Sequence, residues 1–151
     1  MEKPWGNTEQ LIAEDSCLIF RATVREGGFC SVHRHIDMTN HFVVTEGQLA
    51  LLIWDQGLMV APKLRWLTQS CVGYNVAGGF YHQFLALSRC TVLEIYRPKV
   101  GVDGCRATDI QRYTPEGGTD VEYIEQRIEA AKAQVPLSTA PYVRSAQEKK
   151  L

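Results

Sequence analysis

The sequence has no excess of charge of either sign and no long hydrophobic run. Its 151 residues carry 16 Lys and Arg against 17 Asp and Glu, which gives a formal net charge of −1 at pH 7. Such a balance gives no electrostatic reason for binding nucleic acid or an anionic membrane. No apolar run approaches the roughly 18 residues of a membrane-spanning helix. We therefore expect neither nucleic acid nor a membrane among the partners.

Cysteine pairs at metal-binding spacing are also missing. The five cysteines, at positions 17, 30, 71, 90 and 105, are odd in number and scattered. This pattern argues against a disulfide framework and against a thiolate zinc site. Cys30, Cys71 and Cys90 lie in apolar stretches, and we expect them to be packing residues. The opening segment MEKPWGNTEQ lacks the basic and apolar regions of a secretory signal, so we expect a cytoplasmic protein with reduced thiols.

Short apolar runs separated by turn residues fill the chain between positions 17 and 96, and no helical period is present there. The runs predict strands over residues 17–24, 29–35, 41–47, 48–54, 64–68, 71–76, 80–87 and 90–96. Eight short strands with turns between them predict an all-β fold, either a closed barrel or a sandwich.

The C-terminal part has a helical pattern instead. Thr119 and Glu122 form the Thr-x-x-Glu pattern of a capping box. Apolar residues then follow at steps of three and four, which predicts an amphipathic helix ending near Pro136. These residues are Val121, Ile124, Ile128, Ala131 and Val135. We predict a β-barrel domain over residues 1–113 and a C-terminal helix and tail over 114–151, with residues from 138 onward loosely ordered.

Two of the four histidines stand one residue apart in a predicted strand. Side chains alternate between the two faces of a strand, so His33 and His35 point to the same side. Two imidazoles placed in this way can both reach one ion at about 2.1 Å. On its own, the pair is equally typical of two polar residues on a solvated face.

The residues on both sides of His33 and His35 stand at a spacing that resembles a known motif. The spacing of Gly27, His33, His35, Asn40 and Gly47 resembles the first cupin motif, which has glutamate where this chain has Asn40. The segment Ala77–His82 is similar to the second motif, Pro-x-Gly-x-x-His, with Ala77 in place of proline. The resemblance implies a cupin-type double-stranded β-helix, a jelly-roll barrel, followed here by the C-terminal helix. It also implies one divalent metal ion held by His33, His35 and His82.

The resemblance leaves the fourth ligand open. Asn40 offers a neutral oxygen, which is a weaker ligand than a carboxylate, and Asp37 or water are the alternatives. His41 should face away from Asn40. Three neutral histidines leave the full charge on the ion, which makes it a stronger Lewis acid. Zinc, iron, manganese and nickel all accept such ligands, so the sequence does not identify the metal.

A narrower resemblance is to the cupin domain of type II mannose-6-phosphate isomerases. It rests on Pro4-Trp5-Gly6, on the strand 41–47, and on Leu93–Tyr96 followed by Asp109–Tyr113, and it spans residues 3–113. In that family the first ligand is usually glutamine, where this chain has His33. The resemblance implies a homodimer that isomerises a small-molecule substrate, a sugar phosphate.

An isomerase needs a base and a phosphate-binding cation. Glu94 is the candidate base, although a surface carboxylate fits the pattern equally well. Lys63, Arg65 and Arg97 are the candidate phosphate-binding residues.

Two other classes of function fit the same pattern. Three histidines without a carboxylate resemble the site of cupin-type Fe(II) dioxygenases. Phe29, Phe42, Phe80 and Phe84 would then line an apolar interior, although they fit a simple core as well. The third alternative is a non-catalytic cupin that binds a sugar or another small molecule.

Overall fold

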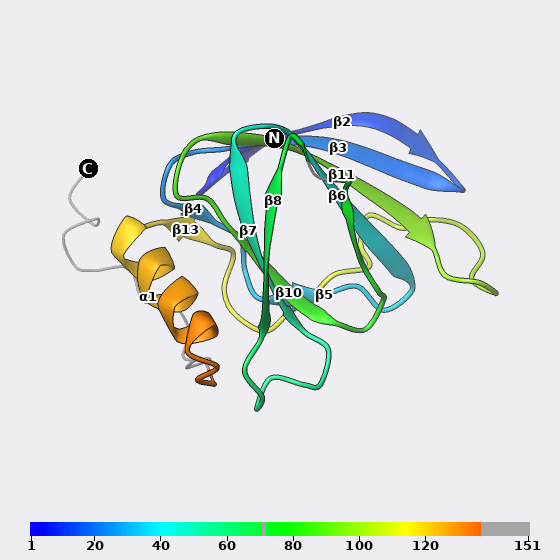
Figure 1. The fold of residues 1–151 in the computed structure, drawn as a ribbon. Coiled ribbons are helices and arrows are strands. Elements are labelled where there is room, and N and C mark those ends of the chain that lie inside the picture. Colours follow the sequence, from blue (N-terminus) through cyan, green and yellow to red (C-terminus); the bar gives the residue numbers. More distant parts are fainter. Residues whose placement is uncertain (71, 137–151) are drawn as a thin grey trace.

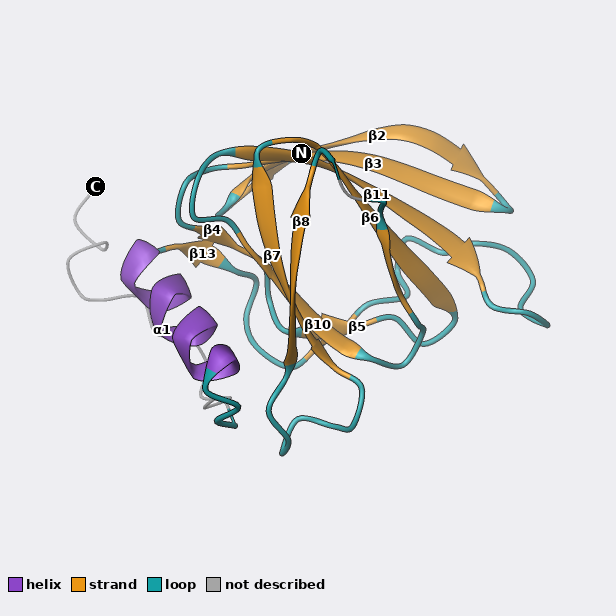
Figure 2. Cartoon of the chain, viewed as in Figure 1, coloured by secondary structure: helices purple, strands orange, loops and turns teal. Residues whose placement is uncertain are grey.

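The computed structural model describes residues 1–70 and 72–136, and this part of the chain forms two β-sheets and one helix (Figures 1 and 2). The strands of the first sheet are, in spatial order, β1 (Glu2–Lys3), β2 (Gly6–Glu14), β3 (Cys17–Val24), β11 (Cys90–Pro98), β6 (Met38–Glu46) and β9 (Tyr74–Val76). Those of the second sheet are β12 (Gln111–Arg112), β5 (His33–Arg34), β10 (Tyr81–Leu85), β4 (Gly28–Phe29) and β13 (Gly118–Thr119), with β7 (Gln48–Trp54) joining β10 to β8 (Lys63–Thr68).

All the paired strands run antiparallel, and strands far apart in sequence lie side by side. The last long strand, β11, lies between β3 and β6, whereas β10 pairs with β4, β5 and β7. Crossing connections of this kind are typical of the jelly roll. The predicted all-β fold with a C-terminal helix is therefore confirmed.

Strand β7 is apolar at nearly every position, and its place in the fold explains why polar and apolar residues do not alternate there. Leu49, Leu51 and Ile53 lie in the core between the two sheets. The residues between them face the opposite side, where Leu52 and Trp54 belong to a second core with the helix. Because both faces of β7 are covered, both sets of side chains are apolar. The predicted bounds of this strand, 48–54, are confirmed.

The helix α1 (Val121–Lys132) covers the outer face of the second sheet (Figure 1). Ile124, Ile128 and Ala131 are buried, as the periodicity predicts. Val121 is exposed, and the helix ends at Lys132 rather than near Pro136, which leaves Val135 exposed beyond it. The predicted cap is wrong by one residue. Asp120 is the N-cap and accepts a hydrogen bond from the backbone of Tyr123, whereas the Thr119 hydroxyl donates to the carbonyl of Pro4.

Other strand predictions need correction at their ends. The segment 29–35 is not one strand, because β4 and β5 are separate two-residue pairings. The strand predicted over 71–76 begins at Tyr74 in the structure, and Cys71 is outside the described residues. After residue 113 the chain adds β13 to the second sheet before the helix begins. The domain boundary stays a prediction, and the prediction for residues from 138 onward falls outside the described residues.

The described cysteines at positions 17, 30, 90 and 105 are all free thiols. Cys30 and Cys90 are buried, as expected for packing residues. Within the described ranges, no helix is both long and apolar enough to cross a membrane.

Candidate metal centre

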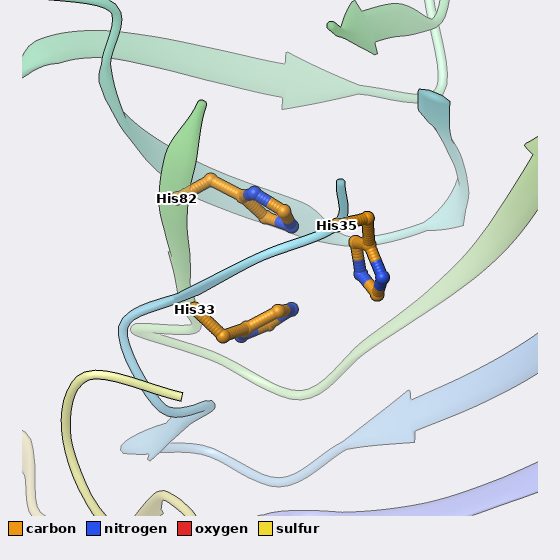
Figure 3. Close-up of side chains that lie close together, drawn as sticks. All are labelled: His33, His35 and His82. Carbon is orange, nitrogen blue, oxygen red and sulfur yellow. The ribbon is translucent and has the colours of Figure 1, made fainter. Parts of the chain in front are cut away.

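Three of the four histidines meet inside the barrel (Figure 3). His33 lies on β5, His35 follows it by two residues, and His82 stands opposite His33 on β10. One ligand atom from each lies within 4.8 Å of those of the other two. Donor atoms at this spacing can converge on one ion, which requires metal–nitrogen distances of about 2.1 Å. The three side chains are buried, with exposed fractions of 6% or less.

Each imidazole is held through its Nδ1 atom by a backbone carbonyl. His33 Nδ1 lies 2.9 Å from the carbonyl oxygen of Ser31, and His82 Nδ1 lies 3.1 Å from that of Phe80. His35 Nδ1 contacts the carbonyl oxygen of Asp109. An Nδ1–H that donates to a carbonyl leaves the lone pair on Nε2, so these contacts select the tautomer that binds metal through Nε2.

The surroundings keep the three imidazoles neutral. Burial lowers the pKa of His33 well below its usual 6.5, and the nearby His82 and His35 lower it further. Burial also lowers the pKa of His35 and brings that of His82 down to about 3, with a contribution from His35. Only the neutral form has a free lone pair for a metal. At neutral pH all three histidines therefore have the required protonation state.

Unsatisfied buried atoms support a metal at this position. Nε2 of His35 and Nε2 of His82 are buried and have no hydrogen-bond partner within residues 1–70 and 72–136. Buried polar atoms nearly always have a partner, so such a pair calls for an explanation. An ion among the histidines would accept both lone pairs. Asn40 Oδ1 is also buried and has no hydrogen-bond partner in the described part of the chain, which keeps it available as a further oxygen ligand.

A buried carboxylate lies next to this cluster. Glu94 is on the inner face of β11 and is 7% exposed, so the alternative of a surface carboxylate is wrong. Its Oε2 accepts hydrogen bonds from Asn40 Nδ2 at 3.0 Å and from the Tyr96 hydroxyl at 2.6 Å. Burial and the Glu94 charge raise the pKa of Tyr96 well above its usual 10, so the hydroxyl stays a donor. The Tyr96 ring is 5.0 Å from that of His35.

Asp109 holds the loop that carries His35 into the strand β6. Its carboxylate oxygens accept hydrogen bonds from the backbone N–H groups of Ile36, Asp37 and Met38, at 2.8 to 3.0 Å. Its own carbonyl contacts His35. Asp109, more than 70 positions later in the chain, therefore fixes the orientation of His35.

Replacing Asp109 by Ala should lower both stability and metal affinity. Three backbone donors would lose a charged acceptor, which we expect to destabilise the fold by about 2 to 4 kcal/mol. Loss of support for a ligand weakens metal binding by about 10- to 100-fold. Urea unfolding and competition with a chromogenic chelator measure the two effects. Asp103→Ala, in the exposed part of the same loop, is the matched control, and equal behaviour of the two variants would contradict this role.

His33 and His35 border a cavity of about 260 Å³ between the two sheets. Much of its wall is apolar and includes Trp5, Phe20 and Phe84, while Glu94 and Tyr96 add polar groups. Among the described residues, the cations that line it are Lys3 and Arg112.

The predicted substrate-binding cations lie elsewhere. Lys63 is exposed on β8 and forms an ion pair with Asp55. Arg65 lies over the ring of Tyr74, and Arg97 is exposed near the end of β11. None of these three predicted residues lines the cavity. Lys63 and Arg65 are exposed on β8, which among the described strands pairs with β7 alone, and Arg97 is exposed on β11.

The remaining predicted residues are two candidate ligands and four phenylalanines, and only some of them lie near the cavity. His41 faces away from Asn40, as expected, and is outside the histidine cluster, as is Asp37, whose backbone is held by Asp109. Of the four phenylalanines, Phe84 lines the cavity and Phe42 lies in the core between the sheets. Phe29 and Phe80 do not line the interior. Phe29 packs under the helix and Phe80 is 37% exposed.

The contacts of Lys3, Asp109 and Arg112 could not be predicted from the sequence. Asp109 and Arg112 stand in a segment that resembles an isomerase motif, but that likeness assigned them no contact. Their partners are about 70 or more positions away in the chain. No local signal marks such pairings.

Comparison with known proteins supports the fold. No protein-family model matches the sequence, and no curated protein is significantly similar to it. Solved structures do match. KdgF from Halomonas sp. aligns with a TM-score of 0.55 at 13% identity, over 64% of this chain and 83% of that one.

Two further solved structures with this fold are also similar. An uncharacterised conserved protein with a double-stranded β-helix domain, from Klebsiella pneumoniae, gives a TM-score of 0.56 at 10% identity, over 74% of this chain and 82% of its own. An RmlC-like cupin protein from Desulfovibrio desulfuricans gives 0.52 at 18% identity, over 62% and 83%. The chain thus has the double-stranded β-helix fold of cupins, with three buried histidines positioned to hold one metal ion.

Proposed function

We propose that this protein is a metal-dependent isomerase that acts on a small sugar phosphate. The observation that carries the proposal is the position of Glu94, a buried carboxylate beside the three histidines and on the wall of the same cavity. Glu94 forms no ion pair with the described residues, and such a carboxylate in a substrate-sized cavity is typical of a proton-transfer residue.

In this proposal the histidines and Glu94 have different roles. His33, His35 and His82 would hold the ion, which when bound supplies a Lewis acid that polarises a substrate oxygen. Glu94 would take a proton from one carbon and return it to the neighbouring carbon, while the hydroxyl proton moves to the former carbonyl oxygen, so that hydroxyl and carbonyl exchange places. Asn40 and Tyr96 both donate to Oε2 of Glu94, which orients the carboxylate and leaves Oε1 for the proton. The apolar wall would limit water around the reacting carbons.

Turnover of mannose 6-phosphate and fructose 6-phosphate tests this activity. The purified protein, loaded in turn with zinc, manganese, nickel and iron, should interconvert the two sugars with at least one metal. NMR in deuterated water would follow the exchange of the transferred proton as well as the product. The metal-free protein is the control. Absence of both interconversion and proton exchange with every metal would contradict the proposal.

The apolar wall of the cavity favours a second candidate, a three-histidine Fe(II) dioxygenase. Trp5, Phe20 and Phe84 suit a less polar substrate than a sugar. Substrate-dependent oxygen uptake by the iron-loaded protein would favour this class. Binding of a sugar phosphate with neither turnover nor oxygen uptake would favour a non-catalytic binding protein.

The homodimer implied by the resemblance is a separate proposal, which light scattering tests.

A further inference from the structure

Arg112 stands in a row of three residues that crosses the second sheet, and the other two are histidines of the metal centre. The register pairs Arg112 with His33 across β12 and β5, and His33 with His82 across β5 and β10. Directly opposite residues on antiparallel strands project to the same face of a sheet. Arg112 therefore projects to the face that carries both imidazoles, and it lines the cavity.

The charge of Arg112 helps to lower the pKa of Glu116, which also lines the cavity, but Arg112 does not pair with that carboxylate. In the described part of the chain its guanidinium has no hydrogen-bond or ion-pair partner, whereas the other cavity cation, Lys3, is bound to Glu116 at 2.7 Å. Arg112 is exposed, which places it at the solvent end of the cavity. A guanidinium presents a planar pair of donors that fits the oxygens of a phosphate or carboxylate.

The separation of the two groups limits the ligand. Neighbouring strands lie about 4.8 Å apart, so the backbone of Arg112 is roughly 5 Å from that of His33 and roughly 10 Å from that of His82. A molecule that contacts both Arg112 and the histidine cluster spans only a few bonds. The cavity of about 260 Å³ holds a molecule of that size.

We propose that Arg112 binds the anionic group of the ligand, which is a small oxyanion carrying a second oxygen group that reaches the histidines. The identity of that ligand as a sugar phosphate rests on the proposed function. Arg112 takes the role that the sequence assigned to Lys63, Arg65 and Arg97. As a recognition residue, it discriminates anionic from neutral molecules of the same shape.

Calorimetric titration of the zinc-loaded protein tests this role. Fructose 6-phosphate and neutral fructose form the matched ligand pair, and glycerate tests a carboxylate in place of the phosphate. The wild type should bind fructose 6-phosphate more tightly than fructose. Arg112→Gln should weaken binding of the phosphate by between about 10-fold and 100-fold and leave fructose binding unchanged. Arg112→Lys should retain part of the preference, and Arg89→Gln, in the exposed turn between β10 and β11, should behave as the wild type.

The outcomes separate this proposal from the isomerase. Arg112-dependent binding without turnover supports the anion site and contradicts the isomerase. Turnover that is unaffected by Arg112→Gln, at equal metal content and melting temperature, overturns the anion site. It is also overturned if the wild type binds none of the anions or prefers neutral fructose. A preference for glycerate over fructose 6-phosphate supports the anion site and identifies the ligand as a carboxylate.

Discussion

The His82→Ala protein is expected to lose high-affinity metal binding, with a decrease in affinity of more than about 100-fold. The two remaining histidines cannot enclose an ion, and loss of a direct ligand exceeds the 10- to 100-fold effect of removing a supporting group. In the wild type, metal at about 1,000 times its dissociation constant should stabilise the fold by about 4 kcal/mol. Thermal unfolding with and without metal measures this stabilisation, and it should be absent in the variant.

His41→Ala is the matched control, because the His41 side chain faces away from Asn40 and lies outside the histidine cluster. This variant should bind metal as the wild type does. The metal-free forms of both variants should be compared first, so that a general loss of stability is separated from loss of the ligand. A His82→Ala protein that still gains the full stabilisation from metal would refute the three-histidine centre.

Replacing Glu94 by Gln should reduce kcat by about 100- to 10,000-fold, the usual contribution of a positioned acid or base. Glutamine keeps the shape of the side chain, and its oxygen can still accept from Asn40 and Tyr96. Metal content and melting temperature should therefore change little. Steady-state kinetics of sugar-phosphate interconversion, with the preferred metal, gives the comparison of kcat with KM.

Two further variants make the Glu94 experiment specific. Tyr96→Phe removes one of the two donors to Oε2 and should lower kcat less than Glu94→Gln does, because the carboxylate remains. Glu46→Gln, at the exposed end of β6, should leave both constants unchanged. If Glu94→Gln retained full kcat while binding its metal, Glu94 would have no part in proton transfer.

The features that the sequence predicted are those marked by local patterns. Strand β7 is a continuous apolar run bounded by turns, and the first turns of α1 carry a regular apolar period, so both were found. The histidine cluster followed from His33 and His35 in alternation and from the glycine before His82. In each case the relevant residues lie within a few positions of one another, or match a spaced motif.

The features that were missed depend on pairing between distant segments. Lys63 and Arg65 are cations in a strand, as the sequence shows, but the sequence does not show that β8 pairs with β7 alone among the described strands and leaves both side chains exposed. The β12–β5 pairing brings Arg112 to His33 across 79 positions of the chain. Burial of Glu94 likewise depends on which face of β11 meets the opposite sheet. Alternation along a strand shows which residues share a face. It does not show which of the two faces is buried when both contain apolar residues.

The position of Asp109 and Arg112 on one short segment has a consequence for the order of assembly. During synthesis, β5, β6 and β10 are complete before this segment leaves the ribosome, yet the orientation of His35 depends on the carbonyl and carboxylate of Asp109. The nascent barrel would thus lack both a fixed third imidazole and the guanidinium. The same dependence holds in the mature protein, where local opening of residues 107–112 would release His35 and Arg112 together. Hydrogen exchange should then show one shared protection level for this segment and for the backbone of residues 36–38, raised by bound metal.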